Sequence, residues 1–250
     1  MKKYFSFLSL LFLLISCQNR TLTNTKVTAK TTQIDSITQQ DSLVIKEFLP
    51  YKSKMIEEVN KVLSYAPKNL IRTDGKLQSS LGNLLADLTF EKANELFQKE
   101  TGKKVDFSMS NYGGIRAGIW KGDVKVMHAF NLMPFENTIV IVELTAEKLE
   151  ELLEYFAVKN QAHPISKQLQ IVANKGFYTL KINGKPIDYN RTYFVATSNY
   201  LQKGGDGMNF FAQPESLYES NFLIRDAIVE HFKSKDTLVS SLDKRVIIQE

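Results

Sequence analysis

The sequence has one cysteine and three histidines among its 250 residues. A single cysteine excludes a disulfide within the chain and a cysteine-rich zinc site. Three scattered histidines leave little material for a centre with several metal ions. The formal net charge of +5 is mild, so we expect no nucleic-acid polymer as a partner. What the chain does contain, 43% hydrophobic and 24% charged residues, is typical of a globular protein rather than a disordered one.

Residues 1–16 have the pattern of a secretory signal. Two lysines open the chain, and the apolar run from Tyr4 to Ile15 is too short to span a bilayer as a helix. The run ends in Leu14-Ile15-Ser16-Cys17, which resembles the cleavage site of bacterial lipoproteins. This pattern predicts a lipidated Cys17 and a membrane-anchored lipoprotein of a bacterial cell envelope, facing the periplasm or the outside. The alternatives are a plain signal peptide with an incidental cysteine, or an uncleaved anchor.

Residues 17–42 are predicted to be the lipidated cysteine and a flexible polar tether. Fifteen of the 25 residues from 18 to 42 are Ser, Thr, Asn or Gln, and none is aromatic. Such a segment cannot bury enough apolar surface to offset its chain entropy. The composition changes at about Leu43, and residues 43–250 contain neither a useful repeat nor a second linker. They predict one α+β domain.

Hydrophobic spacing predicts most of the secondary structure. Apolar residues from Met55 to Leu63 recur at helical spacing, with Pro50 either near the start of that helix or kinking it. The β-branched run from Thr138 to Leu144 predicts a buried strand, and Thr145 can cap the helix that follows it. Further helices are expected from about Ser79 and over Phe222–Phe232, and further strands over Val105–Ser110, Leu169–Ala173, Phe177–Ile182 and Tyr193–Thr197.

One loop motif, Asn111-Tyr112-Gly113-Gly114-Ile115-Arg116, directly follows a predicted strand. Its paired glycines let the backbone approach a ligand closely. Asn111 offers an amide, and Arg116 offers a planar fork suited to phosphate or ribose oxygens. The alternative is a glycine turn with an arginine on the surface.

Two further loop motifs add aromatic side chains. Phe135 precedes the strand that begins at Thr138, and it is either a core residue or an exposed platform for a base whose edge Asn137 reads. In the segment from Ser198 to Gly207, Tyr200 could cover a base while Asp206 accepts hydrogen bonds from two sugar hydroxyls. The alternative for this segment is an ordinary glycine-rich turn.

Together the motifs form a known pattern. From about Leu70 to Phe210 the chain resembles the C-terminal domain of the 5′-nucleotidase family, with four stretches in matching order and spacing. These stretches are Leu81–Asp87, Asn111–Arg116, Pro134–Asn137 and Asn199–Gly207. The resemblance implies a single α+β domain, with a mixed sheet packed with helices, that binds the base and sugar of a nucleotide.

The resemblance also implies a role for each residue of the base and sugar site. Phe135 and Tyr200 would sandwich the base, and Asn137 would contact its edge. Asp206 would hold the ribose hydroxyls. Tyr200 stands where the family often has phenylalanine, a difference that preserves stacking.

The expected phosphate side departs from the family. By the resemblance, Asn111 and Arg116 would contact ribose or phosphate oxygens, in a pocket shaped by Gly113 and Gly114. The family usually has arginine and glutamate just before the Leu81 stretch, where this chain has Asp74-Gly75-Lys76-Leu77-Gln78. Lys76 and the more distant Arg72 are the candidates to substitute, but a lysine loses the bidentate fork.

The family enzymes also have an N-terminal metallophosphoesterase domain whose two metal ions activate water. The tether leaves no room for that domain between Cys17 and residue 43. His128, His163 and His231 show no metal-ligand pattern, so we expect no catalytic residue, metal or cofactor in this chain. The leading hypothesis is the substrate-binding half of a split 5′-nucleotidase that acts on nucleoside 5′-monophosphates, with divalent metals in a separate metallophosphoesterase chain. The alternative is a tethered nucleoside- or nucleotide-binding protein for scavenging.

Overall fold

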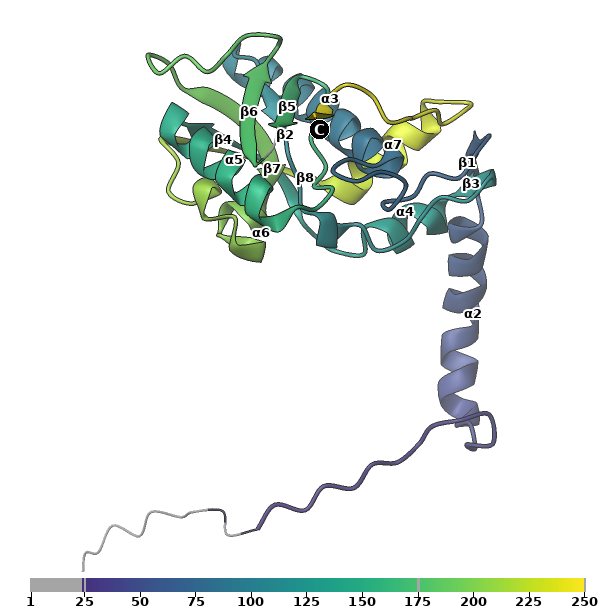
Figure 1. Ribbon diagram of the computed structural model, residues 1–250. Helices are drawn as coiled ribbons and strands as arrows, with labels where there is room; N and C mark the ends of the chain where they lie inside the picture. The colour runs from purple at the N-terminus through teal and green to yellow at the C-terminus, as the bar shows by residue number, and fades with distance from the viewer. Residues whose placement is uncertain (1–23, 25, 175, 250) are drawn as a thin grey trace, which may run out of the picture. The chain divides into compact units, whose positions relative to one another are not determined.

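The computed structural model describes residue 24 and residues 26–174 and 176–249 (Figure 1). The predicted signal, Cys17 and the start of the tether lie outside the described residues. Among the residues that are described, those up to Phe48 form one unit and those from Leu49 onward form another. Helix α2 (Ser42–Val59) begins in the first unit and ends in the second. No helix within these described ranges is long and apolar enough to cross a membrane.

The first unit is polar and exposed. Within it, the backbone N–H of Thr38 donates to the carbonyl of Asp35 in a short turn. Asp41 precedes α2, and its carboxylate accepts from the N–H groups of Leu43 and Val44 at 2.9 and 3.2 Å. These bonds satisfy two of the donors that a helix start leaves free, which explains why α2 begins at Ser42.

A four-stranded mixed sheet organises the second unit. Its strand order is β2 (Phe107–Ser108), β7 (Tyr193–Ser198), β4 (Thr138–Leu144) and β8 (Ser216–Leu223). Strands β2 and β7 run parallel, whereas β4 is antiparallel to both β7 and β8. The predicted mixed sheet packed with helices is therefore confirmed.

The alternation of side chains along β4 divides the hydrophobic core into two clusters. Ile139 and Ile141 pack in one cluster, with helices α3 (Ser80–Thr101) and α7 (Ile224–Lys233). Val142 and Leu144 belong to the other cluster, with α5 (Ala146–Lys159). Successive side chains of a strand point to opposite faces, so one short run of β-branched residues serves both clusters.

Smaller sheets complete the unit. Strands β6 (Phe177–Ile182), β5 (Leu169–Asn174) and β9 (Val246–Gln249) form one of them, with β9 parallel to β5. Strands β1 (Val62–Ala66) and β3 (Gly122–Lys125) form an antiparallel pair, and helix α4 (Val126–Leu132) follows β3.

A buried ion-pair cluster joins the end of the chain to helix α3. The guanidinium of Arg245 lies 2.8 Å from carboxylate oxygens of both Asp87 and Asp243, and it also donates to the carbonyl of Ile165 at 2.7 Å. Pairing and hydrogen bonding make the buried charge tolerable. Asp87, which ends the Leu81–Asp87 stretch, therefore has a structural contact: it links helix α3 to the C-terminal segment.

Several predicted elements are confirmed. The strand over Thr138–Leu144 is found as predicted, and the helix predicted from Ser79 has Ser79 as its N-cap, with its hydroxyl accepting from the N–H of Gly82 at 3.0 Å. Thr145 occupies the N-cap position of α5 as predicted, but its side chain makes no capping hydrogen bond. The hairpin β5–β6 and the strand β7 also match their predictions within one residue.

Other predictions are wrong at their boundaries. Val62 and Leu63 lie in strand β1 rather than in the preceding helix, because their backbone pairs with β3. Pro50 lies inside α2, which rules out the first of its two predicted places, near the start of the helix. Phe222 and Leu223 end strand β8, and the last helix begins only at Ile224. The strand expected over Val105–Ser110 is two residues long.

Candidate nucleoside site

The candidate site lies at one edge of the four-stranded sheet. Parallel strands β2 and β7 end at this edge, since Ser108 pairs with Ala196. Antiparallel β4 starts at the same edge, since Ile139 pairs with Ser198. The loops that carry the three predicted motifs follow β2, precede β4 and follow β7. The sheet topology therefore brings together segments that are far apart in the sequence.

The loop after β2 is a single 3₁₀ turn, η1 (Tyr112–Gly114), preceded by Asn111. A Cβ added to Gly114 would lie 2.7 Å from Oδ1 of Asn111, so glycine is needed for the asparagine to take this position. The N–H of Tyr112 donates to Nδ1 of the buried His163 at 3.2 Å. Arg72 supports the loop from the side, because its guanidinium donates to the carbonyl of Ile115 at 2.6 Å and stacks on the Tyr112 ring.

The loop after β7 begins with the short helix α6 (Asn199–Gln202) and continues into the 3₁₀ turn η2 (Gly205–Gly207). The hydroxyl of Ser198 caps α6 by accepting from the N–H of Leu201 at 3.1 Å. A Cβ on Gly205 would lie 2.5 Å from the Tyr200 ring, so the ring packs directly on the glycine backbone. Asp206 has the left-handed φ of 55°, which aspartate tolerates better than most residues.

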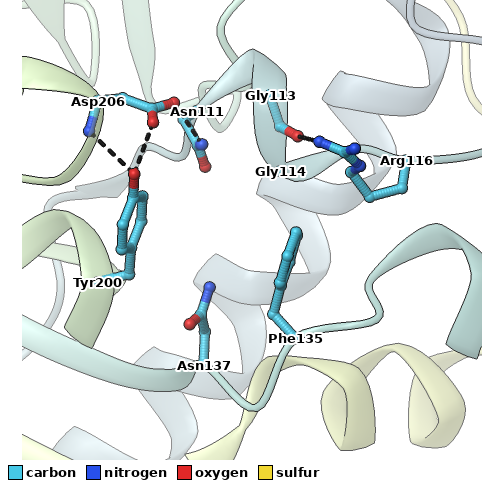
Figure 2. Close-up of a pocket in the computed structure, with 8 residues that line it drawn as sticks. All are labelled: Asn111, Gly113, Gly114, Arg116, Phe135, Asn137, Tyr200 and Asp206. Carbon is cyan, nitrogen blue, oxygen red and sulfur yellow. Dashed lines mark hydrogen bonds between the residues drawn. The ribbon is translucent and has the colours of Figure 1, made fainter. Parts of the chain in front are cut away.

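These loops enclose a cavity of about 290 Å³. Eight of the nine residues predicted to bind substrate line it: Asn111, Gly113, Gly114, Arg116, Phe135, Asn137, Tyr200 and Asp206. Figure 2 shows the Tyr200 and Phe135 rings on opposite sides of this cavity, with the Asn137 amide between them. The ninth, Lys76, is exposed and is not among the residues that line the cavity, so its role in binding substrate stays a prediction.

The sugar end of the cavity, which we define as Asn111, Asp206 and the Tyr200 hydroxyl, is tied together by hydrogen bonds. Oδ2 of Asp206 accepts from the Asn111 amide at 2.7 Å, and Oδ1 accepts from the Tyr200 hydroxyl at 2.7 Å (Figure 2). The N–H of Asp206 donates back to the Tyr200 oxygen at 3.2 Å. The bond to Asp206 raises the pKa of the Tyr200 hydroxyl, because losing the proton would place two negative groups together.

The aromatic walls of the cavity are accessible to a ligand. The residue Phe135 is 38% exposed and Tyr200 is 44% exposed. Of the two alternatives for Phe135, the structure therefore shows a partly exposed ring and not a core residue. The backbone of its loop is held in place, because the carbonyl of Asn137 accepts from the N–H of Ile224 at 3.0 Å.

The arginine end, which we define as Gly113, Gly114 and Arg116, carries one positive charge. The Arg116 side chain is exposed, and its contact with the carbonyl of Gly113 is long, at 3.4 Å. The guanidinium lies 5.9 Å from the centre of the Phe135 ring, within the usual range of a cation–π contact. Arg72, the other cation considered from the sequence, is engaged with backbone carbonyls instead.

Two buried or partly buried side chains, Tyr155 and His163, support the loops of the site. The sequence does not predict this role for either of them. The Tyr155 hydroxyl donates to the backbone carbonyl of Asp206 at 2.9 Å, and burial together with the charge of Asp206 raises the pKa of Tyr155. His163 supports the loop at Tyr112, and burial lowers its pKa to about 4. Tyr155 lies in the helix predicted to follow Thr145, but the sequence gives no sign that its hydroxyl reaches a loop 51 residues away.

The remaining histidines are engaged locally. Nδ1 of His128 accepts from the N–H of Lys125 at 2.9 Å at the start of α4. His231 lies on α7 with Nδ1 3.8 Å from a carboxylate oxygen of Glu91. Within the described ranges, no group of three or more His, Cys, Asp or Glu side chains could hold a metal ion.

Comparison with known proteins identifies the family of the chain. The sequence profile of the 5′-nucleotidase C-terminal domain matches residues 59–213, which is more than half of the chain. The chain belongs to this family. The matched range contains Lys76 and all eight residues that line the cavity.

Relatives of this 5′-nucleotidase C-terminal domain are much longer proteins. The trifunctional nucleotide phosphoesterase YfkN of Bacillus subtilis is 27% identical over 231 residues, which are 83% of this chain and 15% of the relative. The protein UshA of Escherichia coli is 34% identical over 140 residues, which are 53% of this chain and 25% of the relative. The chain therefore spans less than half of each of these curated relatives.

A solved structure shows the same fold. A 5′-nucleotidase precursor from Thermus thermophilus superimposes with a TM-score of 0.67 and 22% sequence identity. The match covers 83% of this chain and 43% of that one. This likeness supports the family assignment at the level of the fold.

Proposed function

We propose that the cavity binds the nucleoside part of a nucleoside 5′-monophosphate, or a free nucleoside, with the base between Phe135 and Tyr200. The observation that carries this proposal is that one cavity is lined by eight of the predicted residues, which come from separate loops. Its volume of about 290 Å³ is near the lower end of small-ligand pockets, which suits one nucleoside better than a larger cofactor. Membership of the 5′-nucleotidase C-terminal family supports the same ligand class.

The chemistry of the lining suits each part of a nucleoside. Two half-exposed rings facing each other offer stacking surfaces to a planar base, and the amide between them offers a donor and an acceptor to its edge. The Asp206 carboxylate can accept from sugar hydroxyls. Arg116 supplies the positive charge toward a 5′-phosphate, through a fork that matches phosphate oxygens.

We further propose that hydrolysis takes place with a separate metallophosphoesterase chain, in a split 5′-nucleotidase. The relatives carry the names of nucleotidases and phosphoesterases, and this chain spans only part of their length. In this arrangement the divalent metal ions belong to the partner, where they would stabilise the attacking and leaving oxygens. The role of this chain is to bind and orient the nucleotide.

A reconstitution assay tests the split arrangement. The full chain is mixed with a candidate metallophosphoesterase chain, and phosphate release from AMP is measured with and without this chain. We expect the Michaelis constant for AMP to fall when this chain is present, and the Asp206→Asn variant to give a smaller effect. No gain over the phosphoesterase alone would contradict the split enzyme and favour a tethered scavenging protein that only binds nucleosides.

The proposed anchor is tested separately. We propose that Cys17 carries lipid and holds the chain at a bacterial membrane. The chain is expressed in bacteria with an alkyne-labelled fatty acid, and the label and the membrane fraction are followed. We expect both to be lost in the Cys17→Ser variant, and label retained in that variant would contradict lipidation at Cys17.

A further inference from the structure

Tyr200 does more than present a ring to the cavity. Its hydroxyl donates to Oδ1 of Asp206 at 2.7 Å and accepts from the N–H of the same residue at 3.2 Å. Both hydrogen-bonding capacities of the hydroxyl are thus directed to one residue. A phenylalanine at this position would provide the same stacking surface without either bond, so the hydroxyl has an effect separate from stacking.

The carboxylate of Asp206 has a protein donor on each oxygen. Tyr200 provides the donor for Oδ1 and Asn111 provides the donor for Oδ2, both at 2.7 Å. A third bond, from the Tyr155 hydroxyl to the carbonyl of Asp206, holds the loop itself. A sugar with two adjacent hydroxyls must therefore share the carboxylate with these donors or displace one of them.

A sugar with one hydroxyl meets a different situation. It can share Oδ2 with the Asn111 amide while the Tyr200 hydroxyl remains on Oδ1, so neither oxygen is left without a donor when the ligand covers the site. A carboxylate oxygen that is covered and left without a donor carries a desolvation penalty. The tyrosine hydroxyl removes this penalty for the deoxy sugar, and it competes with the second hydroxyl of the ribose.

From this geometry, and on the basis of the proposed function, we propose that the Tyr200 hydroxyl sets sugar specificity. It lets the cavity accept deoxyribonucleosides almost as well as ribonucleosides. The substrate class of the site thus includes both sugars, and the residue that broadens it is the one that also forms an aromatic wall.

The packing around Tyr200 allows the hydroxyl to be removed without moving the ring. Its ring lies directly on the backbone of Gly205, and Ser198 caps the helix that carries it. Removing only the hydroxyl in Tyr200→Phe therefore leaves the ring supported by the same contacts. Tyr155→Phe is the matched control, because it also removes a hydroxyl from Asp206, but from the backbone carbonyl rather than the carboxylate.

The experiment measures dissociation constants for adenosine and 2′-deoxyadenosine by titration calorimetry, on the full chain and on both variants. For the unchanged chain we expect the two constants to differ by less than about threefold, because a neutral donor compensates for the missing hydroxyl. In Tyr200→Phe we expect deoxyadenosine binding to weaken more than adenosine binding, because only the ribose brings a second hydroxyl to Oδ1 in place of the tyrosine donor. The ratio of the constants should rise by about fivefold or more. In Tyr155→Phe both constants should change together.

Two results would overturn the inference alone. One is an unchanged ratio in Tyr200→Phe, and the other is a ratio in the unchanged chain that already exceeds about thirtyfold, the size expected for one missing bond to a charged group. If adenosine does not bind the unchanged chain at all, the proposed function and this inference both fall. Binding of adenosine with an unchanged ratio leaves the proposed function standing and removes only the role of the hydroxyl.

Discussion

The sugar end and the arginine end of the cavity are built differently. At the sugar end, Asp206 is bonded to Asn111 and Tyr200, and its loop is held by Tyr155. At the arginine end, Arg116 is exposed, with one long hydrogen bond to a backbone carbonyl and a cation–π contact with the Phe135 ring. The first end has its geometry before a ligand arrives, whereas the second must order a long side chain when it binds.

Under the proposed function, the difference bears on which part of a nucleotide the cavity would hold most firmly. Groups already held in place lose little conformational entropy on binding. Ordering an exposed arginine side chain costs conformational entropy, which offsets much of the free energy that its charge contributes. We therefore expect the base and sugar to provide most of the binding free energy and the phosphate to add little. A weak hold on the phosphate also leaves that group available to a second protein, as a split nucleotidase requires.

The largest effect is expected at Asp206. Asparagine tolerates the left-handed backbone of this position, so Asp206→Asn removes the charge without forcing the loop to move. We expect adenosine to bind about 30-fold more weakly, the equivalent of about 2 kcal/mol, because bonds to a charged acceptor are the stronger ones. Calorimetric titration checks this value, with thermal unfolding as the control for folding. Unchanged affinity would remove Asp206 from the site.

The support beneath the sugar end is expected to be pH-dependent. The pKa of His163 is lowered to about 4 by burial, whereas an unfolded histidine has a pKa near 6.5. As the pH falls below about 6.5 the unfolded chain therefore takes up a proton that the folded chain refuses, and stability is lost progressively toward pH 4. Between pH 7 and pH 5 this histidine should lower the free energy of unfolding by about 2 kcal/mol.

The matched variant for this prediction is His163→Gln. Glutamine retains an acceptor for the N–H of Tyr112 but does not titrate. Urea unfolding at the two pH values should show the extra loss in the unchanged chain and not in the variant. Equal losses in both would mean that His163 is not held neutral beneath the loop.

Removing an aromatic wall should have an intermediate effect. Phe135→Ala deletes one stacking surface, which corresponds to about tenfold weaker adenosine binding. The ring is partly exposed, so the fold should keep its stability. The same variant should bind ribose 5-phosphate as the unchanged chain does, since that ligand has no base. Calorimetry with both ligands distinguishes lost stacking from a general disturbance of the cavity.

The arginine end should respond more weakly and only to phosphate. Arg116→Gln is expected to weaken AMP binding about fivefold and to leave adenosine binding unchanged, because an exposed charge pair contributes little in water. The ratio of the two dissociation constants is the measurement. A larger loss for adenosine than for AMP would show that Arg116 contacts the sugar or the base.

The smallest effect is expected at Lys76. This residue lies outside the cavity, so Lys76→Ala should change the affinity for AMP by less than about twofold, the scale of a distant screened charge. A loss comparable to that of Arg116→Gln would mean that the loop from Asp74 to Gln78 moves to the ligand.

Much of the fold could be predicted because local patterns decide it. The run from Thr138 to Leu144 begins with five β-branched residues and forms the strand it predicts, and Ser79 caps its helix through its own hydroxyl. The errors occur where distant pairing overrides local spacing. Val62 and Leu63 continue a helical pattern, yet they pair with a strand about 60 residues away. The edge strand Ser216–Leu223 is missed because its polar residues resemble a loop.

The site shows the same division. Sequence motifs whose side chains suit a nucleoside predict its eight lining residues. The topology of three strands explains why those motifs meet. Lys76 is predicted from its place in the segment where the family usually has arginine and glutamate, and that place does not show whether the loop faces the cavity. The bond between Tyr200 and Asp206 and the support from His163 depend on three-dimensional packing, which sequence spacing does not specify.

The most direct test compares three ligands on the unchanged full chain. Dissociation constants for adenosine, AMP and ribose 5-phosphate are measured by calorimetry in one buffer. The account predicts that adenosine and AMP bind within about fivefold of each other, as expected of one exposed charge contact, and that ribose 5-phosphate binds at least about tenfold more weakly than either, as expected without base stacking. Ribose 5-phosphate binding as tightly as AMP, with no binding of adenosine, would contradict it.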